Sequence, residues 1–156
     1  MKPDEPILLD AGVFIGALLR GDSRHNEARR IVDAARNGWM QGCLSVGILS
    51  EVYAALTWSG AQPPHSPQEA AQAVRALIEP PSGICVLSDG LEAALKTLEL
   101  AELNNLTARR THDARHAATA ITAGIHQVCT YDVNDWITFE PSGISVIKPS
   151  NVLTML

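Results

Sequence analysis

The sequence predicts an α/β fold in which a mostly parallel sheet of about five strands carries helices on both faces. Three observations lead to this prediction. Short aliphatic segments alternate along the chain with longer segments of helical periodicity. The connections between the aliphatic segments are helix-length rather than hairpin turns, which is typical of parallel strands. No internal repeat, low-complexity tract or linker divides the 156 residues, so we expect residues 1–156 to form one domain.

The predicted strands are short, apolar and bounded by Pro, Gly or polar residues. They are expected at residues 6–9, 39–44, 84–87, 127–130 and 144–147. Three of them contain one cysteine each, namely Cys43, Cys85 and Cys129. An odd number of cysteines without a C-x-x-C spacing argues against a disulfide framework. We therefore expect three buried free thiols.

The first helices follow the first and second strands. A short helix is expected over residues 12–19. Ser23 is predicted to cap a longer helix that ends near Asn37, with Gly38 as its stop. A third helix follows Ser45 and carries apolar residues at helical spacing, namely Ile48, Leu49, Val52 and Leu56.

Clearer start signals precede the remaining helices. Ser66 and Glu69 have the spacing of a capping box, which predicts a helix that ends before the Pro80-Pro81 pair. Asp89 and Glu92 have the same three-residue spacing, and Asp89 is expected to open a helix with apolar residues at positions 91, 95, 98 and 103. Thr111 is predicted to cap a last helix over residues 112–123, with Gly124 behind it.

The composition is that of an ordinary globular protein, with 46% hydrophobic and 19% charged residues. The N-terminus lacks the layout of a signal peptide, and no apolar run approaches the roughly 18 residues of a membrane span. We therefore expect a cytoplasmic protein that does not contact membranes. The net charge of −5 does not by itself indicate a nucleic-acid binder, although nine of the twelve basic residues are arginines, which bind phosphate well.

The stretch "ILLDAGVFIG", residues 7–16, places Asp10 inside an otherwise apolar run. Burying an ionised carboxylate is costly unless a partner compensates for it. Asp10 is therefore either the N-cap of the following helix or a functional carboxylate. The local sequence leaves both interpretations open.

Three more acidic residues occupy comparable positions in the predicted fold. Asp10 and Asp132 follow strands, whereas Glu51 and Asp113 lie in the first turns of helices. In parallel α/β sheets ligands bind beyond the carboxyl ends of the strands, where such positions can meet. The alternative is that the three aspartates are independent helix or turn caps.

A cluster of these carboxylates would need compensating charge. Two carboxylates about 5 Å apart repel by roughly 3 kcal/mol at an effective dielectric constant of ~20. Such a cluster is stable only when cations bind or protons are taken up. Oxygen ligands favour Mg²⁺ or Mn²⁺ over Zn²⁺, and sites of this kind commonly hydrolyse phosphodiesters.

Four segments of the chain resemble, in order, the motifs of the PIN-domain family and of its VapC-type ribonuclease toxins. They are "ILLDAGVFIGALLRGDSRHNEA", "LSEVYAAL", "HDARHAATAI" and "VCTYDVNDW" followed by "GISVIKP". The resemblance runs from about Ile7 to Pro149. It implies a PIN-like three-layer α/β/α sandwich with acidic metal ligands in a groove.

By this resemblance the chain is a Mg²⁺- or Mn²⁺-dependent endoribonuclease and the toxin of a type II toxin–antitoxin pair. The residues that match the family's metal-binding and catalytic positions are Asp10, Glu51, Asp113 and Asp132, with Asp135 as an alternate or supporting ligand. Thr130 matches the family's threonine, which could orient the site through its hydroxyl. The chain departs from the family at Ala11 and Gly12, because many relatives carry a hydrogen-bonding side chain just after the first Asp.

The resemblance also implies partners. VapC-type proteins commonly form homodimers, and a cognate antitoxin holds them inactive by covering the groove, often with an Arg in the acidic site. RNA is the implied substrate. Arg24, His25 and Arg115 are candidates for contacts with its backbone, although each also fits a solvated surface position.

Two other functions remain open. His112 and His116 in "HDARH" have the spacing of two zinc ligands in a zinc hydrolase, but no third ligand motif follows, and Asp10, Glu51 and Asp132 would stay unexplained. Without a zinc role, both histidines are expected on a partly exposed helix face. The other alternative is a PIN-like scaffold that binds RNA or protein without cleavage. Zinc content and metal-dependent RNA cleavage distinguish the three functions.

Overall fold

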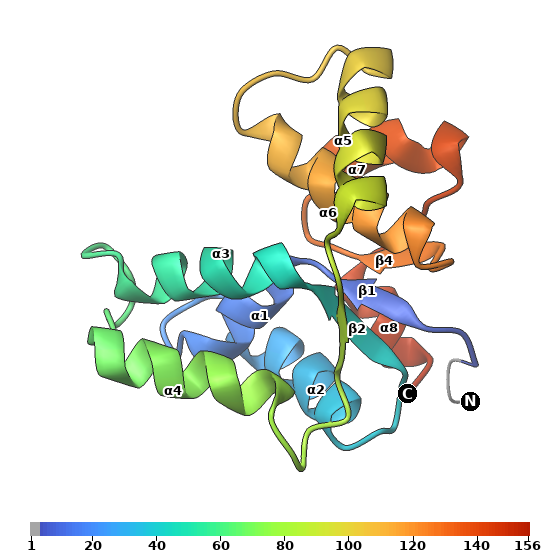
Figure 1. Ribbon diagram of the computed structural model, residues 1–156. Helices are drawn as coiled ribbons and strands as arrows, with labels where there is room; N and C mark the ends of the chain where they lie inside the picture. The colour runs from blue at the N-terminus through green and yellow to red at the C-terminus, as the bar shows by residue number, and fades with distance from the viewer. Residues whose placement is uncertain (1–3) are drawn as a thin grey trace.

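The protein is a three-layer α/β/α sandwich in a computed structural model that describes residues 4–156 (Figure 1). Residues 1–3 lie outside the described residues. They belong to the N-terminal stretch that lacks the layout of a signal peptide. The central sheet has five strands in the order β3-β2-β1-β4-β5, and every neighbouring pair is parallel. The strands are β1 (Ile7–Leu9), β2 (Gly42–Ser45), β3 (Cys85–Leu87), β4 (Gln127–Cys129) and β5 (Ser145–Ile147). The predicted fold class is confirmed.

Helices cover both faces of this sheet (Figure 1). One face carries α1 (Ala11–Leu18), α2 (His25–Arg36), α3 (Val46–Thr57), α4 (Pro67–Ile78) and α8 (Pro149–Thr154). The other face carries α5 (Leu91–Leu103), α6 (Arg110–Thr122), α7 (Val133–Trp136) and the 3₁₀ helix η1 (Ile137–Ser142). Of these, α7, η1 and α8 were not expected from the sequence.

The central strand β1 shows how the two cores form. Ile7 and Leu9 belong to the core under α1–α4 and α8, whereas Leu8 belongs to the core under α5–α7. Successive side chains of a strand point to opposite faces, so a strand covered on both sides must be apolar throughout. This explains why the sequence before Asp10 is an unbroken aliphatic run.

Several predicted helix boundaries hold. Ser66 and Glu69 form a complete capping box at the start of α4, with bonds of 3.0 and 3.1 Å. Gly38 and Gly124 adopt positive φ angles of 73° and 76° behind α2 and α6, a conformation that costs glycine little.

Three predicted caps are wrong. Arg24, Gly90 and Arg109 occupy the N-cap positions that were expected for Ser23, Asp89 and Thr111. Asp89 instead forms an ion pair with Arg115, and the Thr111 hydroxyl donates to the carbonyl of Ala108. Tertiary and local hydrogen bonds have overridden these cap preferences.

One burial prediction, that for Cys85, is also wrong. Cys85 is exposed, because β3 is an edge strand, whereas Cys43 and Cys129 are buried. The apolar stripe of α5 also faces outward, and we call it the leucine face. Its members are Leu91, Leu95, Leu98 and Leu103, with 58–76% of each residue exposed. The opposite side of α5, with Ala93, Thr97 and Leu100, is buried, so periodicity identified a stripe but not the side on which the core lies.

Within residues 4–156 no helix has the length and hydropathy to span a membrane.

Candidate active site

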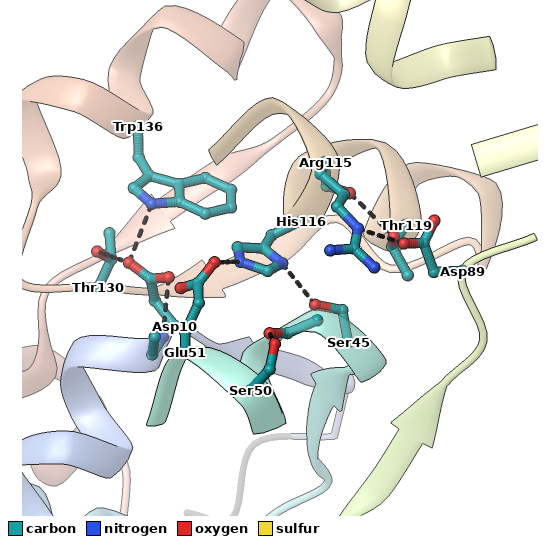
Figure 2. Close-up of polar contacts among 12 residues, drawn as sticks. Asp10, Ser45, Ser50, Glu51, Asp89, Arg115, His116, Thr119, Thr130 and Trp136 are labelled. Carbon is teal, nitrogen blue, oxygen red and sulfur yellow. Dashed lines mark hydrogen bonds and ion pairs between the residues drawn. The ribbon is translucent and has the colours of Figure 1, made fainter. Parts of the chain in front are cut away.

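Asp10 follows β1 directly and is the N-cap residue of α1. Its Oδ1 accepts a 2.9 Å hydrogen bond from the backbone N–H of Ala11. Its Oδ2 accepts bonds from the Thr130 hydroxyl at 2.8 Å and from the indole Nε1 of Trp136 at 3.1 Å, as Figure 2 shows. Asp10 is 5% exposed, and this burial raises the pKa of its carboxyl above the usual value, although the hydrogen bonds act in the opposite direction. The residue therefore caps α1 and also presents a buried carboxylate fixed from three sides.

Thr130 connects Asp10 to the segment after β4. It is fully buried, and its hydroxyl oxygen accepts a 3.0 Å bond from the backbone N–H of Asp132 while it donates to Asp10. Asp132 is the N-cap residue of α7, but its side chain makes no capping bond and is exposed. The carboxylate of Asp132 is thus near Asp10 and available to solvent.

Glu51 lies on α3, and its Oε1 accepts a 2.7 Å bond from Nε2 of His116 on α6 (Figure 2). The other ring nitrogen of His116, Nδ1, is 2.6 Å from the hydroxyl of Ser45. Burial acts to raise the pKa of Glu51, but the His116 bond and the nearby charges of His116, His112 and Arg115 outweigh it and lower the pKa. Glu51 is therefore held in its ionised form.

Asp113 lies in the first turn of α6 and is half-buried. Burial and repulsion from Asp10, with smaller effects from Asp135 and Asp132, raise its pKa to about 7. Burial is the larger cause of this shift, and Asp10 is the acidic residue that contributes most to it.

Asp135 acts more strongly on Asp113 than Asp132 does. Asp132 raises the pKa of both Asp10 and Asp113, whereas Asp135 affects only Asp113. Asp135 is exposed, and its Oδ1 lies 4.0 Å from Nε of Arg110.

The three residues predicted to contact RNA all have partners within the protein. Arg24 pairs with Asp22 at 2.8 Å, and its guanidinium lies over the ring of Tyr131, 4.9 Å from the centroid. Nδ1 of His25 is 3.0 Å from the carbonyl oxygen of Gly16. Arg115 forms an ion pair with Asp89 (Figure 2). Arg24 and Arg115 each keep more than a third of the side chain exposed.

Sequence reasoning missed three residues of the site. Trp136 was not singled out, Ser45 was considered only as the residue before a helix, and His116 was expected on a partly exposed face. His116 is in fact 1% exposed, because α6 packs it against α3 and the end of β2. Its position three residues after Asp113 was the one available signal, since residues at i and i+3 share a helix face.

An open cleft of about 690 Å³ lies along the segment that follows β4. Its polar lining includes Glu27, Thr130, Asp132, Asp135 and Lys148. Asp10, Glu51 and Asp113 do not line this cleft, so it adjoins the Thr130–Asp135 side of the site.

The carboxyl groups fit a hard divalent cation in their chemistry. They offer oxygen ligands, and burial together with repulsion from Asp10 raises the pKa of Asp113, a shift that a bound cation would oppose. In the described part of the chain no three His, Cys, Asp or Glu side chains lie close enough together to hold a metal ion. A zinc pair on α6 is disfavoured because His112 is exposed and both ring nitrogens of His116 are already engaged.

Comparison with known proteins adds a family and a set of related folds. A protein-family model described as "PIN domain" matches residues 7–135. A search of curated proteins gave no significant match.

Similar solved structures include three bacterial proteins. The Mycobacterium tuberculosis toxin VapC20, described as cleaving the sarcin–ricin loop, is 18% identical, with a TM-score of 0.66 over 89% of this chain and 96% of that chain. FitAcB from Neisseria gonorrhoeae is 16% identical, with a TM-score of 0.64 over 92% and 98%. VapBC2 from Rickettsia felis, bound to a promoter DNA fragment, is 13% identical, with a TM-score of 0.62 over 92% and 98%.

Proposed function

Because this chain belongs to the PIN-domain family, whose members are typically nucleases, we propose that it is a Mg²⁺- or Mn²⁺-dependent endoribonuclease. One observation carries the proposal more than any other. Asp10 is buried, fixed by three hydrogen bonds and electrostatically coupled to Asp113 and Asp132. A carboxylate that only caps a helix does not require other carboxylates nearby, whereas a carboxylate that binds a cation usually shares it with others.

In this proposal Asp10, Glu51, Asp113 and Asp132 are the ligands, with Asp135 as an alternate ligand. Binding of the cation would have to draw these carboxylates closer together than they lie in the metal-free protein. The metal ion, when bound, activates a water and stabilises negative charge at the scissile phosphate. Thr130 and Trp136 keep the carboxylate of Asp10 from rotating. Asp113, with a pKa raised to about 7, can take up or release a proton near neutral pH in the metal-free protein.

The proposed partner is an antitoxin, which makes this chain the toxin of a toxin–antitoxin pair. A solved structure from Klebsiella pneumoniae that shares the fold is described as a toxin–antitoxin complex. The cleft beside the site carries Glu27, Asp132 and Asp135, and these carboxylates favour a cationic side chain from a bound protein. The same cleft is the proposed entrance for RNA, with Lys148 on its rim.

A homodimer is proposed through the leucine face of α5. Four large apolar side chains on one exposed helix face are unusual for a monomer. Lys96 and Glu99 form an ion pair with each other on the same helix, so they leave no unpaired charge between the leucines. A second copy of the chain is therefore the proposed occupant.

A scaffold that binds RNA without cleaving it is the second candidate. It is favoured by the spacing of the acidic side chains, since no three of them in residues 4–156 are within reach of one ion. An RNA-cleavage assay distinguishes the nuclease from the scaffold.

The test is cleavage of RNA by the purified chain during titration with Mg²⁺ or Mn²⁺. The nuclease requires metal-dependent cleavage that Asp10→Asn abolishes. Ser66→Ala, at the start of α4, is the matched control because it removes an exposed cap outside the site. RNA binding without cleavage at any metal concentration would establish the scaffold instead.

A further inference from the structure

The buried imidazole of His116 has a partner at each ring nitrogen. Nδ1 lies 2.6 Å from the Ser45 hydroxyl, and Nε2 lies 2.7 Å from Oε1 of Glu51 (Figure 2). These contacts join the end of β2, the helix α3 and the helix α6, from positions 71 and 65 residues apart in the chain. A side chain that is 1% exposed and bonded at both nitrogens has one orientation available to it.

The hydroxyl of Ser45 is committed to this imidazole. Ser45 is the N-cap residue of α3, a position where serine ordinarily accepts a bond from a backbone N–H of the first turn. Its side chain makes no such capping bond and is instead directed to His116. The helix therefore lacks its side-chain cap, and the serine orients the ring.

Gly47 provides the space for this arrangement. A Cβ atom at position 47 would lie 3.3 Å from Cε1 of His116 and 2.8 Å from a guanidinium nitrogen of Arg115. A larger residue at position 47 would displace the guanidinium of Arg115 and press on the ring of His116. Because α3 and α6 approach each other closely at Gly47, the ring of His116 reaches Glu51.

The direction of the hydrogen bonds follows from the partners. An ionised carboxylate has no proton to donate, so Nε2 of His116 donates to Glu51. A hydroxyl can donate or accept, so Ser45 can complete the bond at Nδ1 whether or not that nitrogen carries a proton. Nε2 can therefore donate to Glu51 from either the neutral or the protonated ring.

We propose that His116, oriented by Ser45, is a positioning residue that holds the carboxylate of Glu51 in place to bind the divalent cation. The inference rests on the proposed metal-dependent function. Groups that hydrogen-bond a ligating carboxylate fix its orientation, and their loss typically weakens metal binding or activity about 10- to 100-fold. His116 contributes without touching metal or RNA.

The experiment measures Mn²⁺ binding to the intact protein by electron paramagnetic resonance, without RNA. His116→Leu removes both hydrogen bonds at similar volume. His116→Gln places an amide N–H near the position of Nε2 and should restore the bond to Glu51. Thr119→Val is the matched control, because Thr119 is equally buried on α6 and its hydroxyl bonds only to the carbonyl of Arg115.

The expected result is a Mn²⁺ affinity lowered about 10- to 100-fold in His116→Leu, with values close to the wild type in His116→Gln and Thr119→Val. A folded His116→Leu protein with unchanged affinity would overturn the inference. An equal loss in Thr119→Val would also overturn it, because the effect would then come from loosening of α6. A wild-type protein that binds no Mn²⁺ would refute the metal site itself, and this inference with it.

Ser45→Ala keeps the proposal testable if His116→Leu does not fold. The ring stays in place but loses its orienting bond, so we expect a smaller loss of Mn²⁺ affinity. Thermal unfolding of the metal-free protein shows that the variant is folded. Unchanged affinity in a folded Ser45→Ala protein would contradict the proposed role.

Discussion

The indole Nε1 of Trp136 donates a 3.1 Å hydrogen bond to Oδ2 of Asp10, across 126 positions of sequence. Trp136 is fully buried and is held in turn by an edge-to-face contact with Phe139, at a centroid distance of 5.5 Å. The hydrogen bond between Trp136 and Asp10 ties the segment after β4 to the residue after β1. It also makes Trp136 part of the support of the proposed catalytic carboxylate.

Trp136→Phe should therefore slow RNA cleavage while the fold is kept. The ring is largely retained, but one hydrogen bond to a charged group is lost, and we expect a rate about tenfold lower, or roughly 1.4 kcal/mol. The measurement is kcat at saturating Mg²⁺. Trp39→Phe, at an exposed tryptophan, should leave kcat unchanged. Equal rates for Trp136→Phe and the wild type would remove Trp136 from the site.

Asp10→Asn and Asp113→Asn should abolish cleavage without loss of the metal-free fold. Burial raises the pKa of both carboxyls, which means that ionising either one in the folded protein costs free energy, and a neutral amide relieves that cost. We expect a free energy of unfolding equal to or slightly above that of the wild type in urea denaturation with a chelator at pH 8. A large loss of stability in both variants would favour the interpretation as structural caps.

The stability of the metal-free protein should fall as the pH rises through 7. The folded state binds the proton of Asp113 more tightly than the unfolded chain does, because the pKa rises from 3.8 to about 7. Its contribution to stability is complete below the unfolded pKa and is lost as the pH passes the folded pKa. Glu51 has a lowered pKa and acts in the opposite direction, but at more acidic pH, below its ordinary 4.5.

Thermal unfolding at pH 5.5 and pH 8 with a chelator measures this effect. The difference in Tm between the two conditions should be smaller in Asp113→Asn than in the wild type. Added Mg²⁺ should raise the Tm of the wild type more at pH 8 than at pH 5.5, because the cation competes with the proton. An identical pH dependence in the two proteins would show that Asp113 is not the titrating group.

Leu95→Glu should convert the proposed dimer to a monomer. Leu95 lies within the leucine face of α5 and is 58% exposed, so a charge there costs little in the monomer but would be buried between two copies of α5. Light scattering coupled to size-exclusion chromatography measures the mass. Leu95→Met, which keeps the face apolar, should remain dimeric. A wild-type protein that is monomeric at all concentrations would refute the interface.

The sequence by itself determined the layers of this protein. Periodicity along each segment separates strands from helices, and the capping box at Ser66 or the glycine at position 38 fixes a boundary, because these signals lie within a few residues of each other. The same local logic placed Asp10 after β1 and Asp132 after β4. Local sequence patterns could not say which side of α5 faces the core. The exposed leucines and the buried side with Ala93, Thr97 and Leu100 both fit the helical period.

Only the tertiary structure decided how the site is held. The bonds from Trp136 to Asp10 and from His116 to Glu51 join residues 126 and 65 positions apart, and no pattern along the chain encodes such pairs. They depend on how closely α6 packs on α3 and where the segment after β4 turns. Local signals act through neighbouring backbone, whereas these hydrogen bonds form only after the sheet and both helical layers have assembled.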